Sequence, residues 1–117
     1  MMKACQITRE EHGDLDVLHL DGALDAGSFN RLESALQMLH AKKRHHVVLD
    51  CENLVYISSV NLGALINFAR NARSESGRLV LAALSPQIQK IINLLGFDSM
   101  LDVYPDLDRA ISACSLD

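Results

Sequence analysis

Two adjacent serines, Ser58 and Ser59, are the side chains of this sequence best placed to carry chemistry. They follow the apolar run 54–57 and precede a segment with helical periodicity, which predicts a strand-to-helix turn. A serine at a helix start accepts hydrogen bonds from the free amides of the first turn. Those amides and the helix dipole also favour an added anion, so a phosphate on the serine can be accommodated without unfolding the helix. The spacing alone favours a plain helix cap, and a phosphoacceptor is the functional alternative.

Other catalytic arrangements do not fit the sequence. The Gly-x-Ser-x-Gly motif of serine hydrolases is absent, and so are the glycine-rich loops that hold nucleotide phosphates. Asp21 and Asp50 end apolar strands, but serines stand where a receiver domain would place its phosphoaccepting aspartate. We therefore expect a binding protein with no enzyme activity and no cofactor of its own.

The histidines and cysteines show no metal-binding pattern, and we expect no metal site. His45 and His46 follow the basic run 42–44 at an expected helix end, where cations interact favourably with the dipole, so we expect a solvated helix end. The other histidines lack the spacing of metal ligands and are expected on the surface or as satisfied core residues: His12, His19 and His40. The cysteines lie far apart and are expected as small buried side chains: Cys5, Cys51 and Cys114.

The elements around the serine turn alternate between strand and helix. Strand-like stretches at 4–11 and 16–20 flank a polar break, which predicts an antiparallel hairpin. The apolar stripe of residues 29, 32, 36 and 39 predicts a helix, with Asp25 or Ser28 as its cap. A short buried strand is expected at 47–49. After the serine turn, the pattern predicts a helix with its stripe at 62–69, a strand at 79–83, a helix from Ser85-Pro86 to Gly96, a strand at 101–104 and a last helix bearing residues 107–114.

This alternation predicts an α/β sandwich with a mostly parallel sheet, right-handed crossovers and an antiparallel hairpin at its front. Functional sites of such open sheets favour the loops after the carboxyl ends of the strands. Ser58 and Ser59 lie in one of these loops.

Composition narrows the class further. A chain of 117 residues with 49% apolar content has the length and core of one domain. Its 11 basic against 15 acidic residues give a net charge of -4, which argues against direct nucleic-acid binding or an anionic membrane surface. No apolar run is long enough for membrane insertion, and the first residues lack the core of a secretory signal. We therefore expect a cytoplasmic protein with protein partners.

At the serine turn the chain resembles the STAS domains, and within them the bacterial anti-sigma factor antagonists, whose phosphorylation loop reads Asp-Ser-Ser-Gly-Leu-Gly. Alignment on Leu62-Gly63 places Ser58 at the family's aspartate and Ser59 at its phosphorylated serine. The same alignment places Val60 at the next small residue and Asn61 at the first glycine. Segments 20–25, 47–50, 77–86 and 92–97 resemble further landmarks of the family, so the resemblance covers nearly the whole chain.

The resemblance implies a single STAS domain over residues 1–117, with a mixed, mostly parallel sheet, an N-terminal antiparallel hairpin and about four covering helices. It also implies an anti-sigma factor antagonist that binds an anti-sigma factor with serine kinase activity. Phosphorylation at Ser59, with Ser58 as the weaker candidate, releases the partner, and a metal-dependent serine phosphatase resets the protein. The partner-binding residues carried over are Asp25, Ser58, Ser59, Val60, Asn61 and Leu62.

Three departures from the family loop leave a second hypothesis open. Ser58 replaces a fixed negative charge, Val60 adds an apolar side chain, and Asn61 replaces a glycine, although asparagine tolerates unusual backbone angles. The alternative is a non-switching STAS scaffold in a sensory complex or a lipid-transport assembly. The sequence leaves open whether the domain forms a homodimer.

Overall fold

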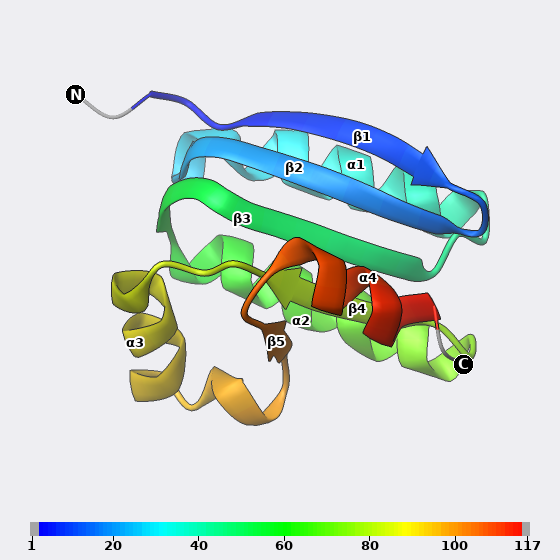
Figure 1. The fold of residues 1–117 in the computed structure, drawn as a ribbon. Coiled ribbons are helices and arrows are strands. Elements are labelled where there is room, and N and C mark those ends of the chain that lie inside the picture. The colour runs from blue at the N-terminus through cyan, green and yellow to red at the C-terminus, as the bar shows by residue number, and fades with distance from the viewer. Residues whose placement is uncertain (1–2, 116–117) are drawn as a thin grey trace.

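A five-stranded mixed sheet organises the part of the chain that the structure, a computed structural model, describes, residues 3–115. Figure 1 shows the strands with helices on both faces. Along the chain the elements are β1 (Gln6–His12), β2 (Leu15–Leu24), η1 (Ala26–Ser28), α1 (Phe29–Ala41), β3 (His46–Ile57), α2 (Ser59–Ser74), β4 (Arg78–Ala82), α3 (Pro86–Leu94), η2 (Phe97–Ser99), β5 (Asp102–Tyr104) and α4 (Leu107–Ser115), where η marks a short 3-10 helix.

The strands follow one another across the sheet in the order β1-β2-β3-β4-β5. β1 and β2 pair antiparallel, and every later neighbour pairs parallel. Gly13 adopts a φ of 62° in the hairpin between the first two strands, a conformation that glycine takes without steric cost. The predicted fold class, a mostly parallel sheet with an N-terminal hairpin, is therefore confirmed.

The two faces of the sheet are covered unequally. α1 and α2 pack on one face and α4 on the other (Figure 1). The larger core lies under α1 and α2, and its helix side chains include Leu32, Leu36, Leu39, Leu62 and Leu65. The smaller core joins Val17, Val48 and Val80 to Ala110 and Cys114 of α4. Since burying a large apolar side chain contributes roughly 1.5–3 kcal/mol, the apolar stripes predicted from the sequence are what fix the helices to the sheet.

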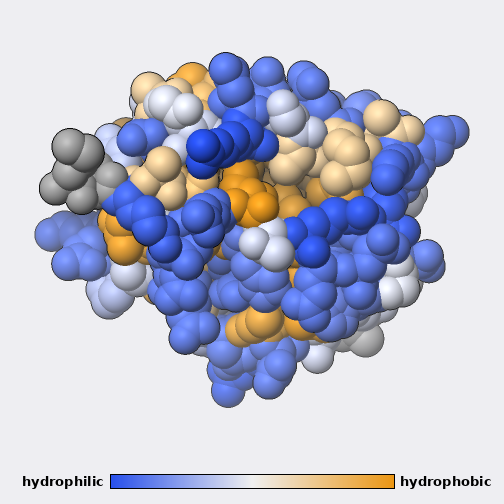
Figure 2. All heavy atoms as spheres, turned by 90° about the horizontal axis from the view of Figure 1, so that it is seen from above, coloured by the Kyte–Doolittle hydropathy of each residue, from blue (hydrophilic) through white to orange (hydrophobic). Residues whose placement is uncertain are grey.

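The first strand forms an outer edge of the sheet and carries charged side chains. Seen from above, hydrophilic residues cover most of this side of the molecule, with hydrophobic residues near the centre and in several smaller areas around it (Figure 2). Arg9, Glu10 and Glu11 lie in this strand. Charged side chains on an edge strand disfavour pairing with another chain through the free backbone groups.

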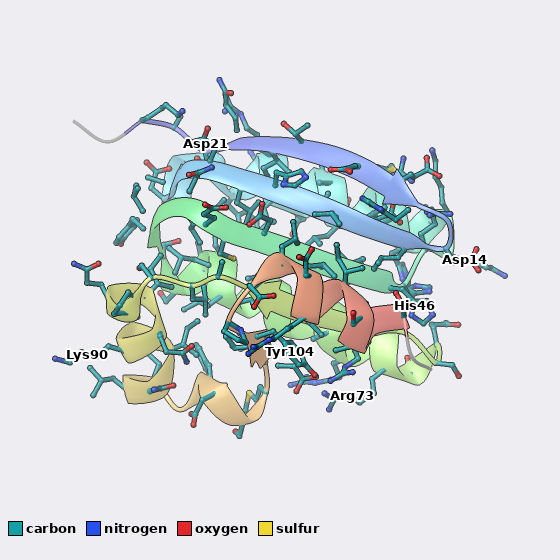
Figure 3. The ribbon with its side chains drawn as sticks, in the orientation of Figure 1. Asp14, Asp21, His46, Arg73, Lys90 and Tyr104 are labelled. Atoms are coloured by element: carbon teal, nitrogen blue, oxygen red, sulfur yellow. The ribbon has the colours of Figure 1, made fainter. Side chains whose placement is uncertain are left out.

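β3 is much longer than the predicted strand at 47–49. It runs through to Ile57 because β2 continues beside it, pairing Leu24 with Ile57 after two register shifts. The apolar run before the serine turn is therefore the end of this same strand. Two side chains labelled in Figure 3 mark the two ends of this part of the sheet. Asp21 lies in β2 toward the end that carries the serine turn, and Asp14 lies in the hairpin turn at the opposite end.

The prediction of a solvated helix end was wrong for His45. This side chain is 5% exposed, and its Nε2 lies 2.9 Å from Nδ1 of His40. Its ring also lies 6.3 Å from that of Phe68, measured between centroids. The chain turns inward after α1 and packs this histidine against α2. Burial, together with the neighbouring His40, lowers the pKa of His45.

Among residues 3–115, no helix has the length and apolar character needed to cross a membrane.

Candidate functional site

The serine turn lies beside the loop that follows β2. The backbone N–H of Ser58 donates to the carbonyl oxygen of Leu24 at 2.8 Å, directly after the last pair of the parallel ladder, Leu24 with Ile57. The carboxyl ends of two neighbouring strands therefore bring Asp25 and the two serines to the same edge of the sheet.

Ser58 is the N-cap residue of α2, but only its backbone carbonyl, and not its side chain, makes a hydrogen bond that starts the helix. Its φ of -85° and ψ of 161° are extended, its carbonyl accepts from Leu62 N–H at 3.0 Å, and its hydroxyl makes no cap hydrogen bond. The predicted serine side-chain cap is therefore wrong for Ser58, because its Oγ instead accepts from the side-chain amide of Asn61 at 2.7 Å. By contrast, Ser85 caps α3 as predicted, accepting from Ile88 N–H at 3.2 Å.

Ser59 is the first residue of α2, and it is exposed. Apolar side chains near it in sequence are also exposed. Val60, on the same turn of helix, is 47% exposed, and near the end of β3 Val55 is 64% and Tyr56 38% exposed. A phosphate on Ser59 would stand at the amino end of a 16-residue helix, where backbone amides and the dipole favour negative charge. The turn thus combines an accessible hydroxyl with apolar surface that can contact a partner.

Asn61 holds the turn from inside. It is fully buried, and its amide nitrogen lies 3.0 Å from Leu24 O, 2.9 Å from Asp25 O and 2.7 Å from Ser58 Oγ. Its backbone is helical and not among the positive-φ positions, so the tolerance of asparagine for unusual backbone angles is not used at this position. Its own Oδ1 is buried without a hydrogen-bond partner among the described residues. The sequence signal for this role was a polar residue three positions after Ser58.

Asp25 organises the neighbouring loop. Its carboxylate accepts from the N–H of Ser28 at 3.0 Å and caps η1, the short helix that leads into α1. Asp25 is thus a cap, as predicted, but of η1 and not of α1 itself, whose N-cap residue Ser28 makes no side-chain cap hydrogen bond. Because the side chain remains half-buried rather than enclosed, the carboxylate lies at the surface next to the serine turn.

The six predicted partner-binding residues are therefore close together but differ in exposure. Asp25 and Ser58 are half-buried, and Ser59 and Val60 are exposed. Asn61 and Leu62 are both fully buried. Because they are enclosed, the last two can influence a partner surface only by holding the turn in place and not by direct contact.

Other reactive groups lie away from this edge or are chemically inert. Burial raises the pKa of the Cys51 thiol to about 12, so this cysteine stays neutral in the core. Burial also raises the pKa of Cys5. Within residues 3–115, no cluster of three or more histidine, cysteine or carboxylate side chains is arranged to hold a metal ion.

Comparison with known proteins identifies the family. The STAS domain matches residues 6–110. The chain belongs to the STAS domain family. This match includes the whole sheet and both loops of the serine edge, so the observed topology and the predicted resemblance agree.

Similar proteins include anti-sigma factor antagonists. The candidate anti-sigma factor antagonist BtrV of Bordetella bronchiseptica is 29% identical over 108 residues, covering 92% of this chain and 93% of that protein. An anti-sigma factor antagonist from Mycobacterium paratuberculosis has a similar structure, with a TM-score of 0.85, 25% identity and coverage of 95% and 94% of the two chains. The Bacillus protein SpoIIAA, solved in its phosphorylated form, shares the fold with a TM-score of 0.70 at 19% identity, covering 94% of this chain and 98% of that one.

Proposed function

We propose that this STAS domain is an anti-sigma factor antagonist that works by partner switching at Ser59. Unphosphorylated, it binds an anti-sigma factor with serine kinase activity and thereby releases the sigma factor. Phosphorylation of Ser59 by that kinase ends the complex, and a metal-dependent serine phosphatase restores the binding form. The observation that carries the proposal is an exposed serine at the start of α2, beside exposed apolar side chains, in a chain similar to anti-sigma factor antagonists.

The proposed switch acts through the charge that a phosphate adds at the surface of the serine turn. A phosphate adds about -1.5 to -2 charges next to Val60, which is 47% exposed. A partner that covers this apolar surface would have to desolvate the phosphate without a matched cation, which opposes binding. The fold need not change, because the phosphate would stand at the favourable end of the α2 dipole.

The test uses the purified chain and the ATPase-type anti-sigma factor of the same organism. Calorimetry should give similar affinities for the parent protein and Ser59→Ala, and a much weaker complex for Ser59→Asp. Ser112→Asp is a matched control, because Ser112 is also exposed but lies on α4. Intact mass after incubation with Mg-ATP should show one added phosphate in the parent and none in Ser59→Ala. Equal binding by Ser59→Ala and Ser59→Asp would refute the mechanism.

A second candidate function is a binding module that never switches. The observation that favours it is Ser58, which replaces the aspartate of the family loop and leaves no fixed carboxylate next to the acceptor in sequence. In that case the same incubation would give a stable complex, no added phosphate, and affinity that depends on Val60 but not on the charge at position 59.

A further inference from the structure

We propose that Asn61 determines which of the two adjacent serines is modified, by holding the hydroxyl of Ser58 inside the turn and leaving Ser59 as the acceptor. This inference rests on the proposed function, because it concerns the specificity of the same phosphorylation site. It depends on two residues of this chain, the serine at the position before the acceptor and the asparagine three residues after that serine.

The hydrogen bonds of Asn61 fix the orientation of its amide. Two backbone carbonyls, Leu24 O at 3.0 Å and Asp25 O at 2.9 Å, face the same side-chain nitrogen. Carbonyl oxygens only accept hydrogen bonds, so the NH₂ group and not the oxygen of Asn61 must point toward them. The same nitrogen lies 2.7 Å from Ser58 Oγ, and because an NH₂ nitrogen only donates, the hydroxyl oxygen accepts in this contact, with the two amide hydrogens shared among three acceptors.

That contact distinguishes the two hydroxyls chemically. During phosphoryl transfer the serine Oγ bonds to the γ-phosphorus of ATP held by the kinase, the bond from that phosphorus to the β,γ-bridging oxygen breaks, ADP leaves, and the hydroxyl proton passes to a base of the kinase. Ser58 Oγ has a lone pair engaged by Asn61 and lies in a half-buried side chain. To react, Ser58 must first break this hydrogen bond and turn outward, whereas Ser59 is already exposed.

Burial makes the asparagine effective in this role. Asn61 is fully buried between the end of β2 and the start of α2, so its amide cannot exchange these partners for water without opening the turn. The hydrogen bonds to Leu24 and Asp25 hold the amide in position, and that position fixes the rotamer of Ser58. Replacement by alanine or glycine leaves the two backbone carbonyls in place but frees the Ser58 hydroxyl.

The first experiment maps the phosphate. With the kinase-type anti-sigma factor and Mg-ATP, peptide mass spectrometry of the parent should place about ten phosphates on Ser59 for each one on Ser58, as expected when a hydrogen bond to a competing hydroxyl must be broken. Asn61→Ala, and Asn61→Gly as a second variant, should lower this ratio several-fold. Asn67→Ala is the matched control, an exposed asparagine on the same helix. An unchanged ratio in both Asn61 variants, with the circular dichroism of the parent, would overturn the inference.

The second experiment needs no kinase, so it separates this inference from the proposed function. Ser58→Cys and Ser59→Cys each introduce one reactive thiol, while the native cysteines are no more than 1% exposed. Iodoacetamide should label Ser59→Cys several-fold faster than Ser58→Cys, and adding Asn61→Ala should accelerate only the Ser58→Cys protein. Equal labelling rates in the parent background would overturn the inference. If labelling follows the expectation but no serine takes phosphate, the switch is refuted and the shielding of Ser58 stands.

Discussion

Replacing Asp16 with alanine tests whether a buried carboxylate holds the hairpin end of the sheet. Asp16 lies at the start of β2 and is fully buried. Its two oxygens accept from Arg9 Nε at 2.8 Å and from Arg44 Nε at 2.7 Å. One arginine comes from β1 and the other from the segment before β3, so the carboxylate joins three parts of the chain that are separate in sequence.

The expected loss of stability follows from the exposure of the two arginines. Removing one partner of a buried ion pair costs about 3–5 kcal/mol, because an uncompensated charge stays buried. Here the side chains of Arg9 and Arg44 remain 24% and 20% exposed, so water partly replaces the carboxylate. We therefore expect Asp16→Ala to lower the free energy of unfolding by about 2–4 kcal/mol. For a chain of 117 residues this corresponds to a fall in Tm of roughly 10 °C.

Urea denaturation followed by circular dichroism measures this loss. Asp98→Ala is the control, because Asp98 is exposed in η2, and such a surface change should stay within about 0.5 kcal/mol. Asp16→Asn should recover only part of the lost stability. One of the two carboxylate oxygens becomes an NH₂ group, which cannot accept a hydrogen bond from the arginine N–H that faces it. If Asp16→Ala unfolds within 1 kcal/mol of the parent at an unchanged m-value, the ion pairs do not stabilise the hairpin as argued.

Three further predictions concern pH, a glycine and a helix cap. The hydrogen bond with Glu10 raises the pKa of His19, with burial opposing and Asp50 adding to the shift. The stability contributed by His19 is therefore complete below about pH 6.5 and is lost as pH rises through the raised pKa. Between pH 6 and pH 8 the unfolding free energy of the parent should change less favourably than that of His19→Gln, and this comparison cancels the opposite contribution of His45, whose pKa is lowered; the same change in both proteins would contradict the role of His19. Gly77→Ala should destabilise by more than about 2 kcal/mol in thermal melts, because its Cβ would overlap the backbone and Cβ of His45; stability equal to the parent would contradict the packing. Ser85→Ala should cost about 1 kcal/mol in urea melts through loss of the α3 cap, and a loss of only a few tenths would show that the cap contributes little.

The elements that follow local rules could be predicted from the sequence. The stripe through Leu32, Leu36 and Leu39 gave α1, the polar break before Leu15 gave the hairpin, and Ser85-Pro86 gave the start of α3. These signals depend on residues within one or two turns of each other. They indicated the order of the elements and hence the edge at which the serine turn lies.

The parts that were missed depend on contacts between distant residues. β3 continues past Asp50 because β2 stays paired with it, although the polar residues 52–53 interrupt its apolar pattern. His45 is buried because α2 packs over it, which a basic run at a helix end does not reveal. The hydrogen bonds of Asn61 span 36 and 37 residues, and the serine cap failed because this asparagine competes for the Ser58 side chain.

The same network separates two ways in which a phosphate can act. If the turn were loosely held, a phosphate on Ser59 could rearrange it, and a change of fold would drive release of the partner. Here Ser58 N–H is bonded to Leu24, and Asn61 joins the turn to Leu24 and Asp25, so the turn is already fixed from within. A charge at the exposed Ser59 should then leave the fold intact and gain up to about 1 kcal/mol from the helix dipole. Ser59→Asp should accordingly unfold at the same urea concentration as the parent or slightly higher, while the proposed complex with a kinase-type anti-sigma factor weakens. A destabilised Ser59→Asp would mean that the switch acts through the fold and not through the surface.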